Sequence, residues 1–257
     1  MKAMILAAGL GTRLRPLTDD RPKALVTVAG RTLLEIALAR LRSVGVGEVI
    51  VNAHYYAEMI VDYLKANDNF CMRIEVSREE ELLDTGGGLK QAAHFFMEDG
   101  GSLQEPFILH NVDVFSNIDL ASMVRFHAEH QALATLAVQQ RETSRYLLFD
   151  EQGQLCGRRA GHDGATEWAR PAAKTEALAF SGIHVLSPKI FAKMEEEGAF
   201  SIIPAYLHLA ARGEKILAFR ADGSYWRDLG RPESIAQAAQ DLSRISRNAL
   251  DLTCPRL

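Results

Sequence analysis

The first half of the chain alternates short apolar segments with longer segments that have the apolar spacing of a helix. Residues 3–8 and 48–53 are apolar runs of strand length, and residues 33–44 carry apolar side chains at helical intervals after a Thr32-x-x-Glu35 capping box. Strands separated by helices of this length form β-α-β units, whose strands are parallel. We therefore predict an α/β fold with a Rossmann-like, mixed and mainly parallel sheet flanked by helices.

The remaining elements follow from the same periodicities. The other predicted strands are residues 72–76, 106–110, 132–139, 146–150, 154–158, 177–186 and 215–220, and the other predicted helices are residues 56–65, 86–96, 201–211 and 232–245. Residues 159–175 are polar and rich in glycine and alanine, which predicts a loop. The sequence has no repeat, low-complexity segment or obvious linker, so residues 1–257 are predicted to form a single domain.

Composition argues against several classes of protein. The net charge is −4 and no basic run is present, which argues against nucleic acid or an anionic membrane as a partner. Cys71, Cys156 and Cys254 lack CxxC spacing, which argues against a thiolate metal site. No apolar run is long enough to span a bilayer, and the N-terminus lacks the basic region of a signal peptide. We expect a cytoplasmic protein, and the sequence leaves its oligomeric state open.

A glycine-rich loop, Gly9-Leu10-Gly11-Thr12-Arg13, follows the first predicted strand. Ligands of parallel sheets bind beyond the C-terminal ends of the strands, where glycines let backbone N–H groups approach phosphate oxygens. Leu14 stands where a dinucleotide-binding loop needs a third glycine, and the Gly-Lys-Ser/Thr of a Walker loop is absent. On the glycines alone, a phosphate loop and a plain strand-to-helix turn are equally open.

Two basic side chains near the glycines favour the phosphate loop. Arg13 places a permanent charge and a fork of hydrogen-bond donors beside them. Lys23 follows at short range, directly after Pro22, which restricts the backbone there. A single lysine is usually a solvated surface charge. One that is held by a proline, ten residues from such a loop, is a better candidate for a phosphate ligand.

The segment Gly9-x-Gly11-Thr12-Arg13-Leu14-x-Pro16-Leu17-Thr18, followed by Arg21-Pro22-Lys23-Ala24-Leu25, resembles the signature of the sugar-1-phosphate nucleotidyltransferases. The resemblance covers nearly the whole chain. It implies the nucleotidyltransferase fold and transfer of a nucleoside monophosphate from an NTP to a sugar 1-phosphate, with release of pyrophosphate. It also implies that Lys23 bridges to the acceptor phosphate. The nucleotide-binding residues implied in this region are Leu6, Ala8, Gly9, Gly11, Thr12 and Arg13.

Two aspartates occupy positions that suit a metal ion. Asp113 follows the predicted strand at residues 106–110, and Asp228 lies in Trp226-Arg227-Asp228-Leu229-Gly230. Taken alone, each aspartate is better explained as a turn residue or a helix cap than as a metal ligand. Beside a triphosphate, two carboxylates suit Mg²⁺, which prefers oxygen ligands. The resemblance implies Mg²⁺ as cofactor with Asp113 and Asp228 as ligands, and a catalytic set of Arg13, Lys23, Asp113 and Asp228.

Two further segments gain a role from the resemblance. Thr85, Gly86 and Gly87 are implied to contact the nucleobase through the backbone, and Ser181 with Gly182 to form the turn that contacts the sugar. The alternatives are a helix start capped by threonine for the first segment and a glycine bulge in a strand for the second.

The chain departs from the family pattern at two places. The usual Gly-Asp before the metal is Asn111-Val112-Asp113 here, and Asn111 is a candidate contact to the nucleotide. The Glu-Lys-Pro that many members carry is missing near Arg158, and Lys174 is a candidate replacement for its lysine as a ligand of the sugar phosphate.

Within the family, the chain length and the segments Asp84-Thr85-Gly86-Gly87-Gly88 and Phe180-Ser181-Gly182-Ile183 resemble most the N-acetylmuramate-1-phosphate uridylyltransferases of bacterial cell-wall recycling. The expected substrates are then UTP and N-acetylmuramate 1-phosphate. Glucose-1-phosphate thymidylyltransferases, mannose-1-phosphate guanylyltransferases and phosphocholine cytidylyltransferases stay open as alternatives. Leu14 together with Lys23 argues against a dehydrogenase, and the presence of Lys23 and both aspartates argues against a non-catalytic nucleotide sensor.

Overall fold

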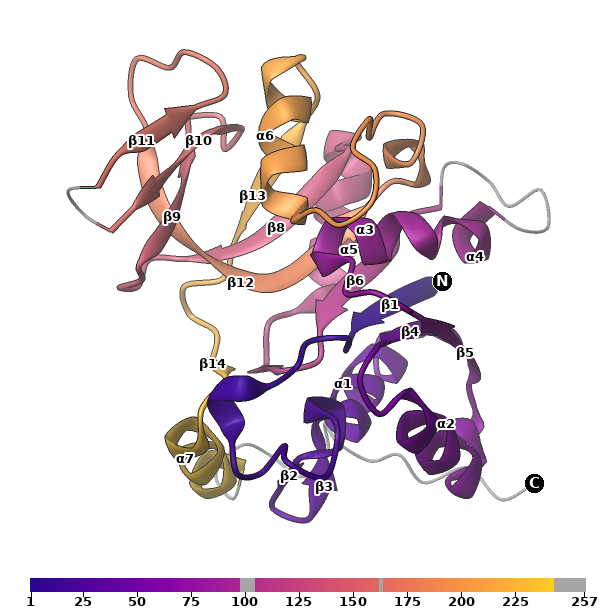
Figure 1. Cartoon of the computed structure of the whole chain (residues 1–257). Helices are drawn as coiled ribbons and strands as arrows, with labels where there is room; N and C mark the ends of the chain where they lie inside the picture. The colour runs from indigo at the N-terminus through magenta and orange to yellow at the C-terminus, as the bar shows by residue number, and fades with distance from the viewer. Residues whose placement is uncertain (98–104, 162–163, 243–257) are drawn as a thin grey trace. The chain divides into compact units, whose positions relative to one another are not determined.

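The computed structural model describes residues 1–97, 105–161 and 164–242 of the chain. Its contacts divide the chain into two units, each built from segments that are distant in sequence (Figure 1). The first unit contains Met1–Leu83, His110–Ser116 and the residues from Trp226 on, and the second contains Asp84–Leu109 and Asn117–Tyr225. The prediction of a single domain over residues 1–257 stays a prediction.

The first unit contains three parallel strands, β1 (Lys2–Leu6), β4 (Glu48–Ala53) and β5 (Arg73–Arg78). Helices α1 (Leu33–Arg42) and α2 (Ala57–Ala66) connect them in sequence. Figure 1 shows both helices on the same side of the strands. Right-handed crossovers that proceed in one direction along a sheet produce this arrangement. The β-α-β arrangement predicted from the first half of the sequence is therefore confirmed for this unit.

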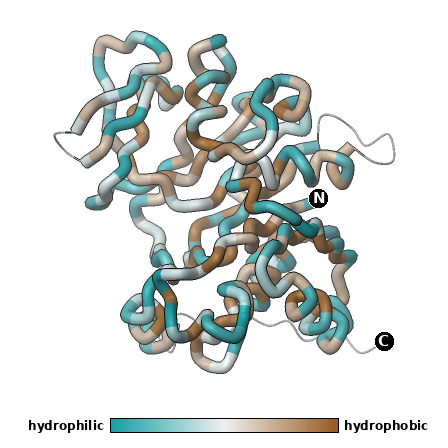
Figure 2. Tube along the Cα trace, in the orientation of Figure 1, coloured by the Kyte–Doolittle hydropathy of each residue, from teal (hydrophilic) through white to brown (hydrophobic). Residues whose placement is uncertain are grey.

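Helix α1 begins where the capping box predicts. The Thr32 side chain accepts a hydrogen bond from the Glu35 backbone N–H at 3.0 Å, which satisfies one of the free donors of the first turn. Leu34, Leu38 and Leu41 then repeat along one face, and all three side chains are fully buried. Figure 2 shows the alternation of apolar and polar residues along the trace. The core of this unit thus follows from local sequence pattern.

Short strands complete the first unit. β2 (Thr27–Val28) pairs with β3 (Arg31–Thr32), and β7 (Val114–Ser116) pairs antiparallel with β14 (Trp226–Asp228). These strands were not predicted, because two or three residues are too few to show a periodicity. The other elements are the 3₁₀ turns η1 (Thr12–Leu14), η2 (Lys23–Leu25) and η3 (Asp68–Cys71), and helix α7 (Pro232–Leu242). Residues 243–245 of the predicted terminal helix lie outside the described residues.

The second unit contains a mixed sheet. β12 pairs antiparallel with β9 along its first half and with β8 along its second half, β10 pairs with β9 and β11, and β13 lies parallel to β8. The strands are β8 (Ala134–Gln139), β9 (Arg145–Phe149), β10 (Leu155–Ala160), β11 (Thr166–Trp168), β12 (Glu176–Leu186) and β13 (Ile216–Arg220). The helical elements are α3 (Asp84–Gln91), α4 (Ala93–Met97), α5 (Leu120–His130), α6 (Ile202–Ala211) and the 3₁₀ turn η5 (Pro188–Ile190). β6 (Phe107–Asn111) is divided between the two units.

Several predictions for the second unit need correction. Residues 159–175 are not all loop, because β11 forms there by pairing with β10, and residues 162–163 lie outside the described part. β11 has no apolar run that could have predicted it. The helix predicted at residues 86–96 is two helices, and α5 was not predicted at all. The α/β class itself is confirmed in both units.

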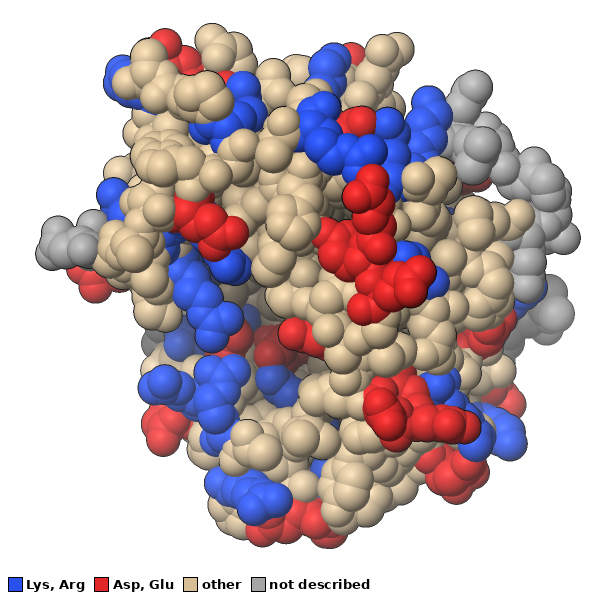
Figure 3. Space-filling model, turned by 45° about the horizontal axis from the view of Figure 1, so that its top comes forward, with Lys and Arg blue, Asp and Glu red and all other residues tan. Residues whose placement is uncertain are grey.

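Basic and acidic side chains are intermixed on the face shown in Figure 3, and neither sign covers it. In the described ranges, no helix has the length and apolar character needed to cross a membrane.

Candidate active site

The loop after β1 is shaped by Gly11. Its φ of +65° is a left-handed conformation, and a Cβ added there would lie 3.0 Å from the Thr18 methyl group. The Thr18 hydroxyl donates to the Gly11 carbonyl at 2.9 Å, which closes the loop on itself. Gly11 is thus required by geometry. Gly9 is exposed and a Cβ added to it would meet nothing within 4 Å, so folding of the loop does not require glycine there.

Lys23 and Asp113 contact each other although they are 90 residues apart. Lys23 begins the 3₁₀ turn η2, after the extended backbone of Pro22, and only 9% of the residue is exposed. Its ammonium group forms an ion pair with the Asp113 carboxylate. Because Lys23 is buried and paired, the structure does not support a solvated surface charge. Two of the four predicted catalytic residues are therefore brought together.

The β7–β14 ladder brings the second aspartate to the same place. Asp228 lies opposite Val114, and the Leu229 N–H donates to the Asp113 carbonyl at 2.8 Å. Asp113 directly precedes Val114, the residue that pairs with Asp228. The two aspartates are therefore one register position apart at the same end of the ladder. The Gly230 N–H donates to Asp228 Oδ1 at 2.7 Å and orients that carboxylate.

Arg13 lies against the same turn. A Cβ added to Gly230 would lie 2.6 Å from Asp228 Oδ1 and 2.9 Å from Arg13 Nη2, so the missing side chain leaves room for both groups. Arg13, Lys23, Asp113 and Asp228 all belong to the first unit. The arrangement combines two cations and two carboxylates, which can hold phosphates and a divalent ion.

The carboxylates fit Mg²⁺ better than a metal held by protein groups alone. Within the described ranges, no group of three or more His, Cys, Asp or Glu side chains is placed to hold a metal ion. Mg²⁺ commonly binds one or two carboxylates and takes its other ligands from water and substrate phosphates. The buried Asn111 Oδ1, two residues before Asp113, has no hydrogen-bond partner among the described residues, so it offers a further oxygen for a ligand.

His110 does not add charge to this site. Its Nδ1 is 2.8 Å from the Asn111 carbonyl oxygen, and the residue is 1% exposed. Burial lowers the pKa of His110 to about 4, so the imidazole is neutral at pH 7.

The segment predicted to hold the nucleobase has packing functions of its own in the second unit. The Gly86 and Gly87 N–H groups both donate to the Phe200 carbonyl, at 2.8 and 3.2 Å, and a Cβ on Gly86 would lie 2.3 Å from the Phe200 ring. The Thr85 hydroxyl oxygen accepts from the Ile202 N–H at 3.0 Å. Close packing against Phe200 is thus a sufficient reason for these glycines, and their contact to a nucleotide stays a prediction.

The predicted sugar-contacting residues also lie in the second unit. Gly182 has a φ of +72°, and the register of β12 with β8 shifts between Phe180 and His184, so the bulge considered for Ser181 and Gly182 is present. Contact of these two residues with a sugar stays a prediction.

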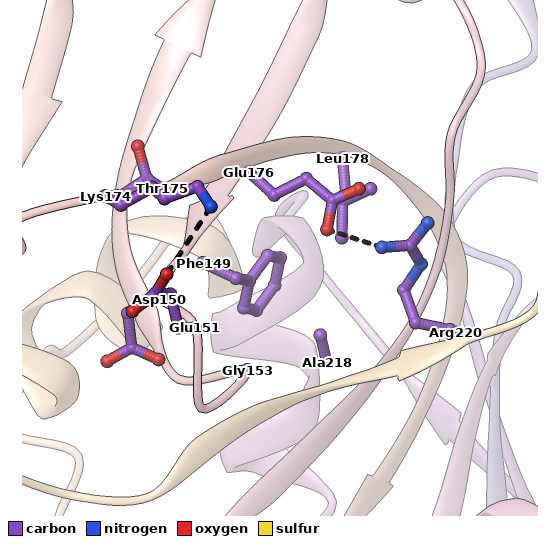
Figure 4. Close-up of a pocket in the computed structure, with 10 residues that line it drawn as sticks. All are labelled: Phe149, Asp150, Glu151, Gly153, Lys174, Thr175, Glu176, Leu178, Ala218 and Arg220. Atoms are coloured by element: carbon purple, nitrogen blue, oxygen red, sulfur yellow. Dashed lines mark hydrogen bonds and ion pairs between the residues drawn. The ribbon is translucent and has the colours of Figure 1, made fainter.

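Lys174 lines a pocket of about 460 Å³ in the second unit. Figure 4 shows Lys174 with Glu151 on one side of it, at 3.5 Å, and Arg220 with Glu176 on the other. The Lys174 side chain is 78% exposed. Because Lys174 is paired with Glu151, a phosphate would have to compete with the Glu151 carboxylate for the Lys174 ammonium group. Its role as a ligand of the sugar phosphate stays a prediction.

One buried polar side chain near the loop was not predicted from the sequence. The Ala7 N–H donates to Asn52 Oδ1 at 2.7 Å, and Asn52 is 2% exposed. Asn52 is a single amide inside the apolar strand at residues 48–53, and this position could have predicted its role. A polar side chain that is buried there requires a hydrogen-bond partner.

The chain is similar to known proteins over most of its length. The profile of the family described as nucleotidyl transferase matches residues 2–245. N-acetylmuramate alpha-1-phosphate uridylyltransferase from Caulobacter vibrioides is 33% identical over 241 residues, which are 90% of this chain and 93% of that protein. Probable mannose-1-phosphate guanylyltransferase 2 from Oryza sativa subsp. japonica is 31% identical over 90% of this chain, which spans only 62% of that relative's length.

Solved structures show the same fold. HddC from Yersinia pseudotuberculosis, complexed with GMP-PN, superposes with a TM-score of 0.74 at 24% identity, over 94% of this chain and 99% of that one. A putative glucose-1-phosphate thymidylyltransferase from Bacillus anthracis gives a TM-score of 0.77 at 18% identity, over 96% of each chain. The chain belongs to the nucleotidyl transferase family. The predicted enzyme class, nucleotidyltransferase, is confirmed.

Proposed function

We propose that the protein joins a nucleoside monophosphate from an NTP to a sugar 1-phosphate and releases pyrophosphate. The observation that carries the proposal is the contact of Lys23 with Asp113, beside the turn that contains Asp228 and lies against Arg13. In the reaction, an oxygen of the sugar phosphate forms a bond to the α-phosphorus of the NTP while the bond from that phosphorus to the β-phosphate oxygen breaks. The attacking oxygen is already anionic, so no strong general base is required.

The main obstacle to this reaction is repulsion between two polyanions. In-line positioning and fixed positive charge therefore supply most of the catalysis. Arg13 stabilises the charge that grows on the departing pyrophosphate, and Lys23 draws the acceptor phosphate toward the α-phosphorus. Asp113 and Asp228 would hold Mg²⁺, which would screen the charge of the α-phosphate.

The proposed nucleotide contacts are those that the sequence predicts. They are Leu6, Ala8, Gly9, Gly11, Thr12, Arg13, Thr85, Gly86, Gly87 and Asn111, with Ser181, Gly182 and Lys174 proposed for the sugar phosphate. The unpartnered Asn111 oxygen supports the assignment of that residue.

For substrates we propose UTP and N-acetylmuramate 1-phosphate. The Caulobacter relative carries that activity in its name and matches this chain along nearly the whole length of both proteins. The setting implied is recycling of the cell wall in the cytoplasm. GTP with mannose 1-phosphate is the second candidate, because relatives named for that activity are 30–31% identical.

The substrate proposal is tested by pyrophosphate release over a grid of UTP, dTTP, GTP and CTP with several sugar 1-phosphates. We expect kcat/KM for UTP with N-acetylmuramate 1-phosphate to exceed the other pairs by about tenfold or more, the range that differential binding of related substrates gives. The Lys23→Ala variant, purified in the same way, corrects for contaminating activity. A preference for GTP with mannose 1-phosphate would move the protein to the second candidate, and no release from any pair would contradict the reaction itself.

The Gly230 turn allows a test of geometry without removal of a charged group. Gly230→Ala places a methyl group against Asp228 Oδ1 and Arg13 Nη2. We expect kcat/KM to fall about tenfold to a hundredfold, because small misplacements of catalytic groups have effects of this size. Both crowded atoms end flexible side chains, so the thermal midpoint should stay within about 2 °C.

Gly223→Ala is the matched control for this variant. Gly223 also lies in a turn, and a Cβ added to it meets nothing within 4 Å. Activity of the control should be unchanged. Equal activity of Gly230→Ala and Gly223→Ala would show that the turn does not set the positions of Arg13 and Asp228.

A further inference from the structure

Two buried polar side chains outside the proposed catalytic set connect the nucleotide loop to a more distant part of the first unit. Asn52, in β4, accepts from the Ala7 N–H through Oδ1 and donates through Nδ2 to Glu79 Oε1, both at 2.7 Å. Glu79 Oε2 accepts from the Leu83 N–H at 3.0 Å. Asn52 is 2% exposed and Glu79 is 5% exposed. An unbroken chain of hydrogen bonds therefore runs from Ala7 to Leu83.

The backbone of Glu79 is held as firmly as its side chain. Its N–H donates to the Ala53 carbonyl at 2.8 Å, and its carbonyl oxygen lies 2.9 Å from His54 Nδ1. Both partners directly follow Asn52 in sequence. Glu79 is thus fixed to the end of β4, so its carboxylate is a rigid anchor for Leu83.

The direction of each hydrogen bond in this chain is determined. Asn52 must turn its amide oxygen to Ala7, which is a donor, and so presents its NH₂ group to Glu79. Glu79 then faces two donors, Asn52 Nδ2 and the Leu83 N–H, and each of its two carboxylate oxygens accepts from one of them. Because the groups are buried, replacement of either acceptor by a donor leaves N–H groups unsatisfied.

The two ends of the chain are next to both predicted nucleotide segments. Ala7 lies between β1 and Gly9, at the start of the loop proposed to wrap the triphosphate. Leu83 directly precedes Asp84-Thr85-Gly86, the segment proposed for the nucleobase. We propose that Asn52 and Glu79 are positioning residues for the nucleotide, which set the backbone at Ala7 and Leu83 without contacting the substrate. This inference rests on the proposed nucleotide binding of these two segments.

The experiment uses the fixed donor and acceptor of each hydrogen bond between Ala7 and Leu83. Glu79→Gln keeps the shape but turns an NH₂ group toward another donor, and Asn52→Asp sets a second carboxylate against Glu79. The double variant Asn52→Asp/Glu79→Gln restores every bond with the polarity of the middle one reversed. In it, the carboxylate introduced at position 52 accepts from the Ala7 N–H and from the amide NH₂ introduced at position 79. The oxygen of that new amide accepts from the Leu83 N–H.

We expect each single variant to weaken calorimetric binding of UTP with Mg²⁺ about tenfold, the effect of one unsatisfied buried group. If the substrate grid favours GTP, GTP is the probe. The double variant should return to within about threefold of wild type, as coupled partners do in a double-mutant cycle. KM for the sugar phosphate should change less than about twofold in all three. Glu48→Gln, at the start of the same strand, is the control and should bind the NTP like wild type.

The outcomes separate this inference from the proposed function. Single variants that lose thermal stability but keep NTP affinity would show a purely structural network and overturn the inference. A folded double variant that stays as weak as the single variants would overturn the polarity argument. Wild-type protein that binds NTP but releases no pyrophosphate would contradict only the proposed reaction, because the affinities are measured without turnover.

Discussion

Replacement of either Asp113 or Asp228 by asparagine will lower kcat/KM by about a hundredfold or more, equivalent to roughly 3 kcal/mol of lost stabilisation of the transition state. Asparagine keeps the shape of each side chain and can still accept the Gly230 N–H bond at position 228. The change therefore removes charge from the proposed metal site and leaves the turn in place. Steady-state pyrophosphate release measures the effect.

Chelator should abolish the activity of the wild-type protein, and added Mg²⁺ should restore it. Asp222→Asn is a matched control, because Asp222 lies in the second unit and caps the Gln140 N–H. Its activity should stay within about twofold of wild type, as expected for a substitution outside the catalytic machinery. Full activity in excess chelator would contradict the assignment of both aspartates.

The second large effect separates Lys23 from Arg13, which a general basic pocket would treat alike. Each lost contact to phosphate should cost about 2–4 kcal/mol in the transition state, or roughly thirtyfold to a thousandfold in rate. Arg13→Ala should act mainly on kcat, because the charge it faces grows as the leaving group departs. Lys23→Ala should lower kcat and also weaken binding of the sugar phosphate.

Calorimetry distinguishes the two roles. NTP binding should survive Lys23→Ala better than sugar-phosphate binding does. Lys65→Ala, which changes an exposed lysine of α2 in the same unit, should alter neither. If Lys23→Ala left both sugar-phosphate affinity and turnover unchanged, the bridging role would pass to another cation, and Lys174 would be the first to test.

Much of the first unit could be read from local sequence. The strand predicted at residues 48–53 is β4 with the same bounds, and Thr32 caps α1 as the capping box indicates. These elements are dictated by short-range chemistry, since apolar periodicity and a cap act within a few residues. The loop signature likewise identified the family, which the comparisons confirm.

Other features depended on pairings between distant segments. β7 and β14 have three residues each, too few for a periodic signal, yet their register brings Asp113 next to Asp228. β11 exists only because β10 offers it an edge. Local sequence does not encode register, because it results from which strands meet in the folded chain.

The sequence by itself determined the class of fold, the start of helix α1 and the types of residue available for phosphate chemistry. The tertiary structure decided which of them meet. Lys23 contacts Asp113 across 90 residues, and Asn52 connects Ala7 to Glu79 inside the core. Burial makes such contacts specific, because a charged or polar group removed from water must find a partner with the right polarity and distance. That requirement is met only in three dimensions, so the active-site arrangement could be seen only once the chain was folded.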